Sequence, residues 1–226
     1  IVVWIWNFIG SLLTALPIAY IKGIPLNPHE IINMFYKEPY LASYIELSSV
    51  GGLPLIITLL CRDNLAIYGL RRSGLLKSIA LSSLWVIIKL APRIPTGNWI
   101  PKPVSFNLQF PLNIWYAILG VLTYGPLEVF FVIWLIVNTD YALKSFDKTF
   151  SPGLIITAII FGLSHIIFSP SGRILNAIDV TITFLILGLI FKYSGNSMGP
   201  MIAWTLINRY VIYLVAGCLT FSAPHG

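Results

Sequence analysis

The sequence predicts an all-α protein, a polytopic bundle of transmembrane helices. Hydrophobic residues make up 57% of the 226 residues, charged residues only 10%, and the mean hydropathy is +0.86. An ordinary soluble domain carries roughly 25% charged residues. The apolar runs lack the alternation of a membrane β-barrel, so helices are the remaining way to pair every backbone group in lipid. We therefore expect one integral membrane domain over residues 1–226.

The apolar runs form about seven segments (six to eight), each close to the ~20 residues that a helix needs to cross a bilayer. In chain order, the predicted spans are residues 1–21, 40–61, 74–91, 112–138, 152–168, 174–193 and 199–220. Lys77 and Lys89 flank the segment 74–91 so closely that it could instead lie at the interface. Glu46 comes early in its own segment, and we expect it at the interface too.

The connecting segments contain cap and loop signals. Asn27, followed by Pro28, predicts the cap of a short interfacial helix over 31–36, and Asn196 or Ser197 is predicted to cap the last helix. Lysine and arginine are divided almost evenly between the two sides of the membrane, and only the Arg71-Arg72 pair favours one side as cytoplasmic.

The net charge of +6 is spread over the loops. No cluster of basic residues alternates with aromatic residues, which argues against nucleic-acid binding. The charge is typical of loops that contact anionic lipid headgroups of the bilayer.

Three strongly polar residues lie inside separate predicted spans. They are a carboxylate, Glu128, an imidazole, His165, and a carboxamide, Asn208. Such groups are unfavourable in hydrocarbon and usually mark a site or a partner. Together they are the components of a buried hydrolytic centre, although Glu128 could instead pair with a hydroxyl such as that of Tyr124, and His165 and Asn208 could simply join helices.

Two further charges, Asp179 and Arg209, lie on the last two predicted spans. Neither is favourable alone in lipid, so we expect them to form a structural ion pair. A rival arrangement pairs Arg209 with Glu128.

The order and placement of three elements, Glu128, Phe161-x-x-x-His165 and Trp204-x-x-x-Asn208, resemble the CPBP family of intramembrane proteases. That family includes CAAX prenyl endopeptidases and bacteriocin-processing and self-immunity proteins. Its motifs are Glu-Glu-x-x-x-Arg, Phe-x-x-x-His and His-x-x-x-Asn or Asp, each on its own helix. The resemblance covers roughly residues 112–215.

The chain departs from the first and third motifs. If Glu128 is the first glutamate, Val129 replaces the second; if it is the second, Leu127 replaces the first. Phe131 favours the second register, and the arginine position is apolar in both. Trp204 stands where the third motif has its histidine. An indole donates one hydrogen bond and cannot exchange a proton, so Trp204 could donate to an oxyanion but not act as a base or a metal ligand.

The resemblance implies a mechanism in which Glu128 removes a proton from water, His165 orients the water, and Asn208 stabilises the oxyanion. Phe161 and Trp204 would then belong to the substrate site. Glu128 and His165 are only two good metal ligands, fewer than the three of a catalytic zinc site, so we expect a water nucleophile and no cofactor. The three catalytic side chains should converge on one polar cavity.

Three functions remain open from the sequence. The first is a CAAX-protease-like intramembrane endopeptidase, of glutamic or metallo type, that hydrolyses a membrane-anchored or lipidated peptide in a prokaryotic plasma membrane. The second is a pseudoenzyme that serves as a membrane scaffold or as the binding subunit of a membrane-protein complex. The third is a small transporter whose intramembrane charges are Glu128, Asp179 and Arg209.

Overall fold

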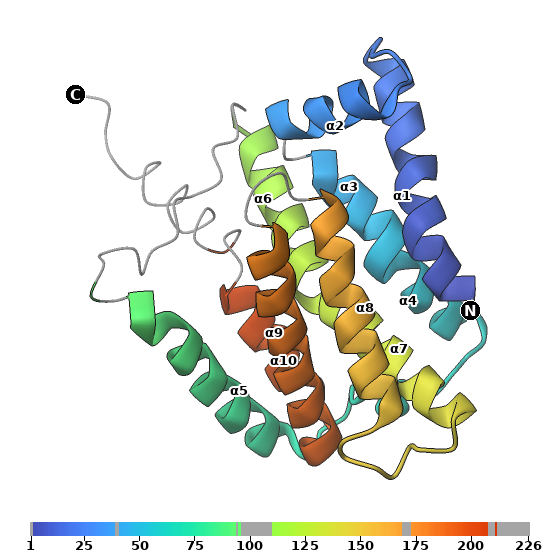
Figure 1. Ribbon diagram of the computed structural model, residues 1–226. Coiled ribbons are helices and arrows are strands. Elements are labelled where there is room, and N and C mark those ends of the chain that lie inside the picture. The colour runs from blue at the N-terminus through green and yellow to red at the C-terminus, as the bar shows by residue number, and fades with distance from the viewer. Residues whose placement is uncertain are drawn as a thin grey trace. The chain divides into compact units, whose positions relative to one another are not determined.

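The computed structural model describes most of the chain, and every regular element in that part is a helix (Figure 1). The described residues are 2–38, 41–93, 95, 110–168, 173–207 and 211. The predicted all-α fold is confirmed. The chain divides into two compact units. The first unit comprises Ile1–Ile57, Val86–Glu128 and Trp204–Gly226, and the second comprises Thr58–Trp85 and Val129–Ala203.

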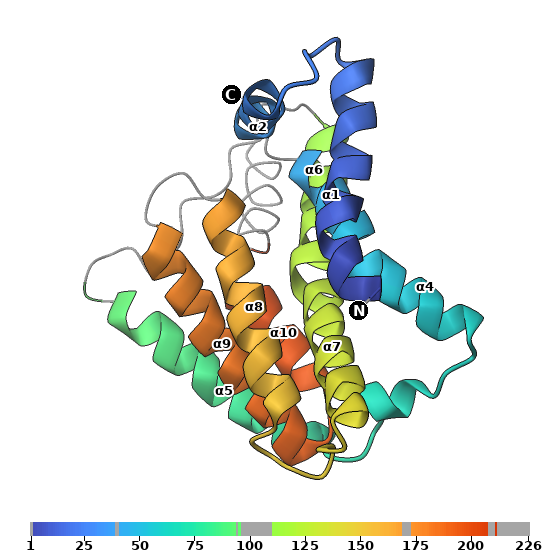
Figure 2. The ribbon, with the colours of Figure 1, turned by 45° about the vertical axis from the view of Figure 1, so that its right-hand side comes forward.

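The first unit is built around α1 and two helices that each contain a π-helical turn. Its helices are α1 (Val2–Ile21), α2 (Pro28–Lys37), α3 (Ala42–Glu46), the start of α4 (Leu53–Leu60), the end of α5 (Leu75–Leu90), α6 (Leu112–Leu122) and the end of α10 (Met198–Ile207). It also contains the π turns η2 (Leu47–Gly52) and η5 (Thr123–Leu127) and the 3₁₀ turn η4 (Ala91–Arg93). α1 lies beside α3 and η2, as Figure 2 shows. Trp6 Nε1 donates to the Ser48 carbonyl oxygen at 2.8 Å, and the hydroxyls of Thr14 and Ser48 are also hydrogen-bonded. These contacts join α1 to η2.

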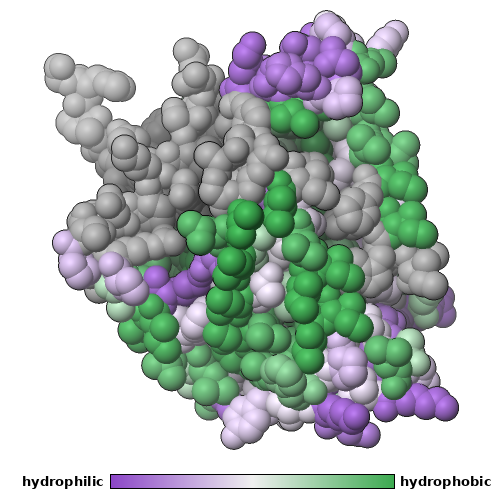
Figure 3. Space-filling model, in the orientation of Figure 1, coloured by the Kyte–Doolittle hydropathy of each residue, from purple (hydrophilic) through white to green (hydrophobic). Residues whose placement is uncertain are grey.

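The short helix predicted over 31–36 is longer in the structure, where it forms α2 (Pro28–Lys37). Its predicted cap is confirmed, because Asn27 Oδ1 accepts a hydrogen bond from the Glu30 backbone N–H at 2.9 Å. Proline at the first helical position has a suitable φ and no N–H to satisfy. Figure 3 shows polar side chains over α2, as expected of an interfacial helix.

The two π turns bring the helices that carry them into close contact. Pro126 lies inside η5, where its missing N–H and its ring are incompatible with a regular α-helical turn. η2 packs against η5. A Cβ at Gly51 would lie 2.3 Å from Leu127 Cβ, so only glycine permits this approach.

The second unit has a core of large apolar side chains from three helices. Its elements are η3 (Leu65–Tyr68), most of α5 (Leu75–Leu90), α7 (Glu128–Ala142) after its first residue, α8 (Pro152–Phe168), α9 (Arg173–Ser194) and most of α10 (Met198–Ile207). α8 and α9 lie side by side along most of their lengths. Gly162 permits this contact, because a Cβ there would lie 1.8 Å from Thr181 Oγ1. The outward faces of both helices are apolar in Figure 3.

A buried carboxylate organises the connection between α7 and α8. Asp140 is fully buried and accepts hydrogen bonds from the hydroxyls of Ser145 (2.9 Å) and Ser151 (2.6 Å) and from the Gly153 N–H (2.9 Å). Lys192 Nζ forms an ion pair with it at 2.9 Å. The loop after α7 is therefore held by one side chain.

A buried amide organises the connection between α9 and α10. Asn196 Oδ1 accepts from the Met198 N–H at 2.9 Å, which confirms the predicted cap of the last helix. Asn196 Nδ2 donates to the carbonyl oxygens of Arg71 and Ser73. The segment before α5 is thereby joined to the start of α10.

Three helices in the described part of the chain are long and apolar enough to cross a membrane: Ala42–Leu60, Leu112–Ala142 and Ile174–Ser194. They correspond to three predicted spans. Three other predicted spans correspond, in the described residues, to shorter apolar helices, Ile9–Ile21, Pro152–Ile166 and Met198–Ile207. Segment 74–91 forms α5, which has 16 residues. A count of about seven spans stays a prediction.

Candidate functional site

Glu128 and Trp204 form the centre of a buried polar site in the first unit. Glu128 follows η5 directly, and only 4% of it is exposed. The indole N–H of Trp204, on α10, donates to Glu128 Oε2 at 2.6 Å. Trp204 thus uses its single hydrogen-bond donor on the carboxylate, and Glu128 has a polar partner that allows its burial.

A second carboxylate, Glu46, interacts electrostatically with Glu128 in the same unit. Glu46 is the last residue of α3, and η2 begins immediately after it. Sequence reasoning assigned Glu46 to the interface and did not connect it with Glu128. One feature of the sequence could have indicated this interaction: only three carboxylates, those of Glu46, Glu128 and Asp179, lie inside the predicted spans.

His165 and Phe161 form a second cluster, within the second unit. His165 Nδ1 lies 2.9 Å from the Phe161 carbonyl oxygen, one turn earlier on α8. A carbonyl only accepts, so Nδ1 carries the proton and Nε2 of the neutral ring carries the free lone pair. The His165 ring also meets the Phe161 ring edge-on, with centroids 5.1 Å apart.

Phe161 is buried and packs edge-on against Phe184 (4.7 Å between centroids) and at a tilt against Phe131 (6.0 Å). Its rotamer is therefore set by the core of the second unit. This arrangement favours a role in holding His165, and the predicted contact of Phe161 with substrate stays a prediction.

The described part of the chain does not show several predicted site residues in contact with one another. Asn208 and Arg209 lie outside them, so the predicted ion pair with Asp179 is outside them as well. Glu128 belongs to the first unit and His165 to the second. Convergence of Glu128, His165 and Asn208 thus stays a prediction. Among the described residues, no three His, Cys, Asp or Glu side chains are grouped so that they could hold a metal ion.

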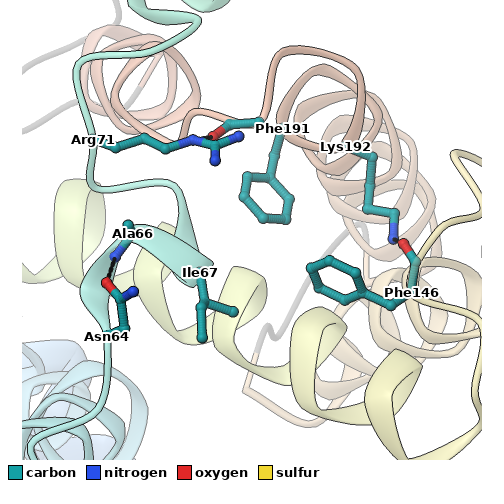
Figure 4. A pocket seen from close by; sticks show the side chains of 8 residues that line it. Asn64, Ala66, Ile67, Arg71, Phe146, Phe191 and Lys192 are labelled. Carbon is teal, nitrogen blue, oxygen red and sulfur yellow. Dashed lines mark hydrogen bonds between the residues drawn. The ribbon is translucent and has the colours of Figure 1, made fainter.

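The second unit also contains an open cavity of about 330 Å³ at one end of α9 (Figure 4). It is lined by Asn64, Ala66, Ile67, Arg71, Phe146, Phe191, Lys192 and Gly195. Both of its cations are already engaged: Arg71 Nε donates to the Gly195 carbonyl oxygen at 2.7 Å, and Lys192 Nζ donates to that of Phe146 at 2.6 Å. The cavity contains none of the predicted site residues.

The helical fold and the three long apolar helices indicate a membrane protein, and one of these helices carries the buried Glu128 carboxylate. Residues 110–210 match the family model described as type II CAAX prenyl endopeptidase Rce1-like. This segment carries Glu128, His165 and Trp204, and the match confirms the resemblance to the CPBP/CAAX protease family found in the motifs. Comparison with curated proteins and with solved structures gave no match.

Proposed function

We propose that the protein is an intramembrane endopeptidase that hydrolyses a peptide bond of a membrane-anchored or lipidated peptide, with Glu128 as the base that activates water. The observation that carries this proposal is the buried Glu128 carboxylate held by the Trp204 indole at 2.6 Å. A general base must be fixed in position and within reach of the water whose proton it takes. The family match supports the reaction class.

The hydrogen bond from Trp204 engages one oxygen of the carboxylate. Oε2 of Glu128 accepts the indole N–H, and in this proposal Oε1 takes the proton from water. A charge-assisted bond of this kind is stronger than a neutral one and restricts the rotamer of the carboxylate. Trp204 therefore positions the base, whereas donation to the oxyanion falls to other groups.

His165 and Asn208 have complementary roles in this proposal. The Nδ1 proton of His165 is engaged by the Phe161 carbonyl oxygen, so Nε2 can accept a hydrogen bond from the attacking water. Asn208 offers an amide N–H₂ to the oxyanion of the tetrahedral intermediate, a contribution of ~3–4 kcal/mol in known cases.

The test is cleavage of a fluorogenic peptide that ends in a prenylated cysteine and three further residues, with purified protein reconstituted in lipid vesicles. Glu128→Gln is nearly isosteric and cannot take a proton, so it should lower kcat by ~10²–10⁴-fold. Glu30→Gln is the matched control, because Glu30 lies at the exposed start of α2 and should leave kcat unchanged. Cleavage that survives Glu128→Gln would rule out Glu128 as the base.

A second candidate function is a pseudoenzyme that binds peptides or serves as a subunit of a membrane complex. It is supported by the apolar residues beside Glu128: Val129 is buried in the second unit, and Leu127 packs against Gly51. Neither position offers a second carboxylate. Prenylated peptide that binds the vesicles and is never cleaved, by the wild type or by Trp204→His, would favour this function.

We also propose that the chain crosses a prokaryotic plasma membrane several times. The length of the helix Leu112–Ala142 supports at least one complete crossing. In a background with both native cysteines replaced by serine, Leu112→Cys and Leu143→Cys should react with an impermeant maleimide from opposite sides of the membrane. Labelling of both from one side would contradict a crossing by this helix.

A further inference from the structure

We propose that Glu46 is a proton-sharing partner of Glu128, so that the site contains a pair of carboxyl groups contributed by two different helices. This inference rests on the proposed function and names a second acid–base group for the same site. The positions next to Glu128 in the chain are apolar, so a partner cannot come from the same helical turn. The structure offers one from α3.

The two helices that carry these carboxylates are held together on both sides of Glu46. On one side, the rings of Tyr44 and Tyr116 meet edge-on, with centroids 5.7 Å apart and planes at 89°. On the other side, Gly51 packs directly against Leu127. α3 also contacts η5 and α6. Glu46 lies between these two contacts in sequence, and Glu128 directly follows the second.

Each carboxylate also lies at the end of a π turn. Glu46 immediately precedes η2, and Glu128 immediately follows η5. π turns are rare and are frequent at functional sites. One extra residue in a helix rotates everything beyond it by about 100°, the angle per residue of an α-helix. The turn at η5 therefore determines which face of the helix Glu128 occupies.

A buried hydroxyl lies on the helix that carries Glu46. The carboxyl groups of Glu46 and Glu128 interact electrostatically. Ser43, one turn before Glu46, is fully buried, and its hydroxyl has no hydrogen-bond partner among the described residues. A bound water or a substrate carbonyl near the pair would satisfy this hydroxyl.

Two ionised carboxylates in a medium of low dielectric constant repel each other strongly. The pair is therefore most stable when it carries one proton in total, so that one group is ionised and the other neutral, as in other carboxylate dyads. Trp204 donates to Glu128, which favours the ionised form on that residue and the protonated form on Glu46. Glu128 is then the base and Glu46 the acid.

The hydrolytic step balances with these two groups and one water. Glu128 takes a proton from water while the water oxygen forms a bond to the carbonyl carbon of the scissile peptide. Glu46 then gives its proton to the amide nitrogen as the C–N bond breaks, which releases an amine and a carboxylic acid. The proton on Glu128 passes to Glu46 and restores the starting state.

The first readout is the pH dependence of kcat/KM in vesicles. The wild type should show a bell-shaped profile, because the base must be ionised and the acid protonated. Glu46→Gln should lower kcat by at least ~10²-fold, the lower end of general acid–base contributions. It should also abolish the fall of kcat/KM at alkaline pH, because that fall reports loss of the proton from the acid. On α3, η5 and α6, the other titratable groups are the phenols of Tyr44, Tyr124 and Tyr116.

The second readout does not depend on activity. Infrared difference spectra of the wild type at neutral pH should contain a protonated-carboxyl band, lost in Glu46→Gln and altered in Glu128→Gln. Glu30→Gln is the control for both readouts and should change neither. Tryptophan fluorescence during thermal unfolding checks that each variant is folded.

The outcomes separate this inference from the proposed function. If Glu128→Gln abolishes cleavage but Glu46→Gln changes neither the profile nor the band, the inference is wrong and the proposed function stands. If the band depends on both residues but nothing is cleaved, the carboxyl pair is supported and the proposed hydrolysis is wrong. Absence of both the band and cleavage would contradict the two proposals together.

Discussion

Trp204 donates its indole N–H to the Glu128 carboxylate at 2.6 Å, and this bond joins two positions 76 residues apart in the chain. Within the CPBP/CAAX resemblance, Trp204 stands at a histidine position. A tryptophan there cannot act as an acid or a base, but it can hold the carboxylate in one orientation. Relative to the family motif, the chain therefore lacks one acid–base group, and the residue in its place is hydrogen-bonded to Glu128.

Replacement of Trp204 by phenylalanine should weaken both stability and catalysis. Trp204→Phe keeps an aromatic ring and removes the donor, which leaves Glu128 with an unsatisfied oxygen at a cost of ~1–3 kcal/mol in the free energy of unfolding. A misplaced base should also lower kcat by about 10-fold or more. The measurements are unfolding in detergent and cleavage in vesicles.

The matched control for this change is Trp134→Phe. Trp134 Nε1 donates to the Thr58 hydroxyl at 3.1 Å, within the second unit. Loss of this neutral bond should cost ~0.5–1.5 kcal/mol and leave kcat unchanged. Equal effects of the two substitutions on kcat would contradict a special role for Trp204.

Replacement of Trp204 by histidine should raise the cleavage rate. One imidazole N–H can keep the bond to Glu128, while the other ring nitrogen has a lone pair that can accept a proton. Trp204→His therefore keeps the positioning contact and adds an acid–base group. The single-turnover rate with the prenylated peptide measures the effect, and a rate at or below that of the wild type would contradict it.

Removal of the Asp140 carboxylate should destabilise the second unit strongly. Asp140 and Lys192 form a buried ion pair, with side chains 0% and 6% exposed. Asp140→Ala leaves the lysine charge without its partner and removes three further hydrogen bonds, so the free energy of unfolding should fall by ~3–5 kcal/mol. Chemical denaturation in detergent is the measurement.

A solvent-accessible ion pair in the first unit provides the comparison. The side chains of Lys22 and Glu38 are each 32% exposed. Glu38→Gln should therefore cost no more than ~1 kcal/mol, as for other exposed pairs. If Asp140→Ala costs as little as Glu38→Gln, the Asp140 carboxylate does not hold the loop between α7 and α8.

The titration of Tyr68 should lower the free energy of unfolding at alkaline pH. Burial, together with its hydrogen bond to Asp63 Oδ2 at 2.5 Å, raises the pKa of Tyr68 from 10.0 to about 12. A pKa that is higher in the folded state contributes stability that is complete below pH 10 and is lost as pH rises toward 12.

The difference in unfolding free energy between the wild type and Tyr68→Phe isolates this contribution, because the two proteins have the same titratable groups apart from Tyr68. The difference should be constant from pH 8 to 9.5 and should shrink between about pH 10 and 12. A difference that stays flat over the whole range would contradict the raised pKa.

Much of the local structure was readable from the sequence because its causes are local. The caps at Asn27 and Asn196 were predicted from short polar side chains that satisfy free N–H groups at the start of a helix. The contact between Phe161 and His165 follows from their spacing of four residues on one helix face. The all-α class follows from composition alone.

The partners of Glu128 could not be read in the same way. Trp204 was predicted to belong to the substrate site, and in the structure its indole donates to Glu128. Glu46 was predicted at the interface, and in the structure it interacts electrostatically with Glu128. Each lies 76 or more residues from Glu128 in the chain, and contacts of that separation depend on how helices cross. No periodicity in the sequence encodes such a crossing.

By itself, the sequence determined the class of protein, the helices and the family that residues 110–210 resemble, because hydrophobicity, capping and motif spacing act within one helix. Tertiary structure decided which polar groups share a site. The Gly51–Leu127 contact sets how closely two helices approach, and the π turn at η5 sets the direction in which Glu128 projects. Both depend on packing between segments distant in the chain, which hydrophobicity, capping and motif spacing within one helix do not encode.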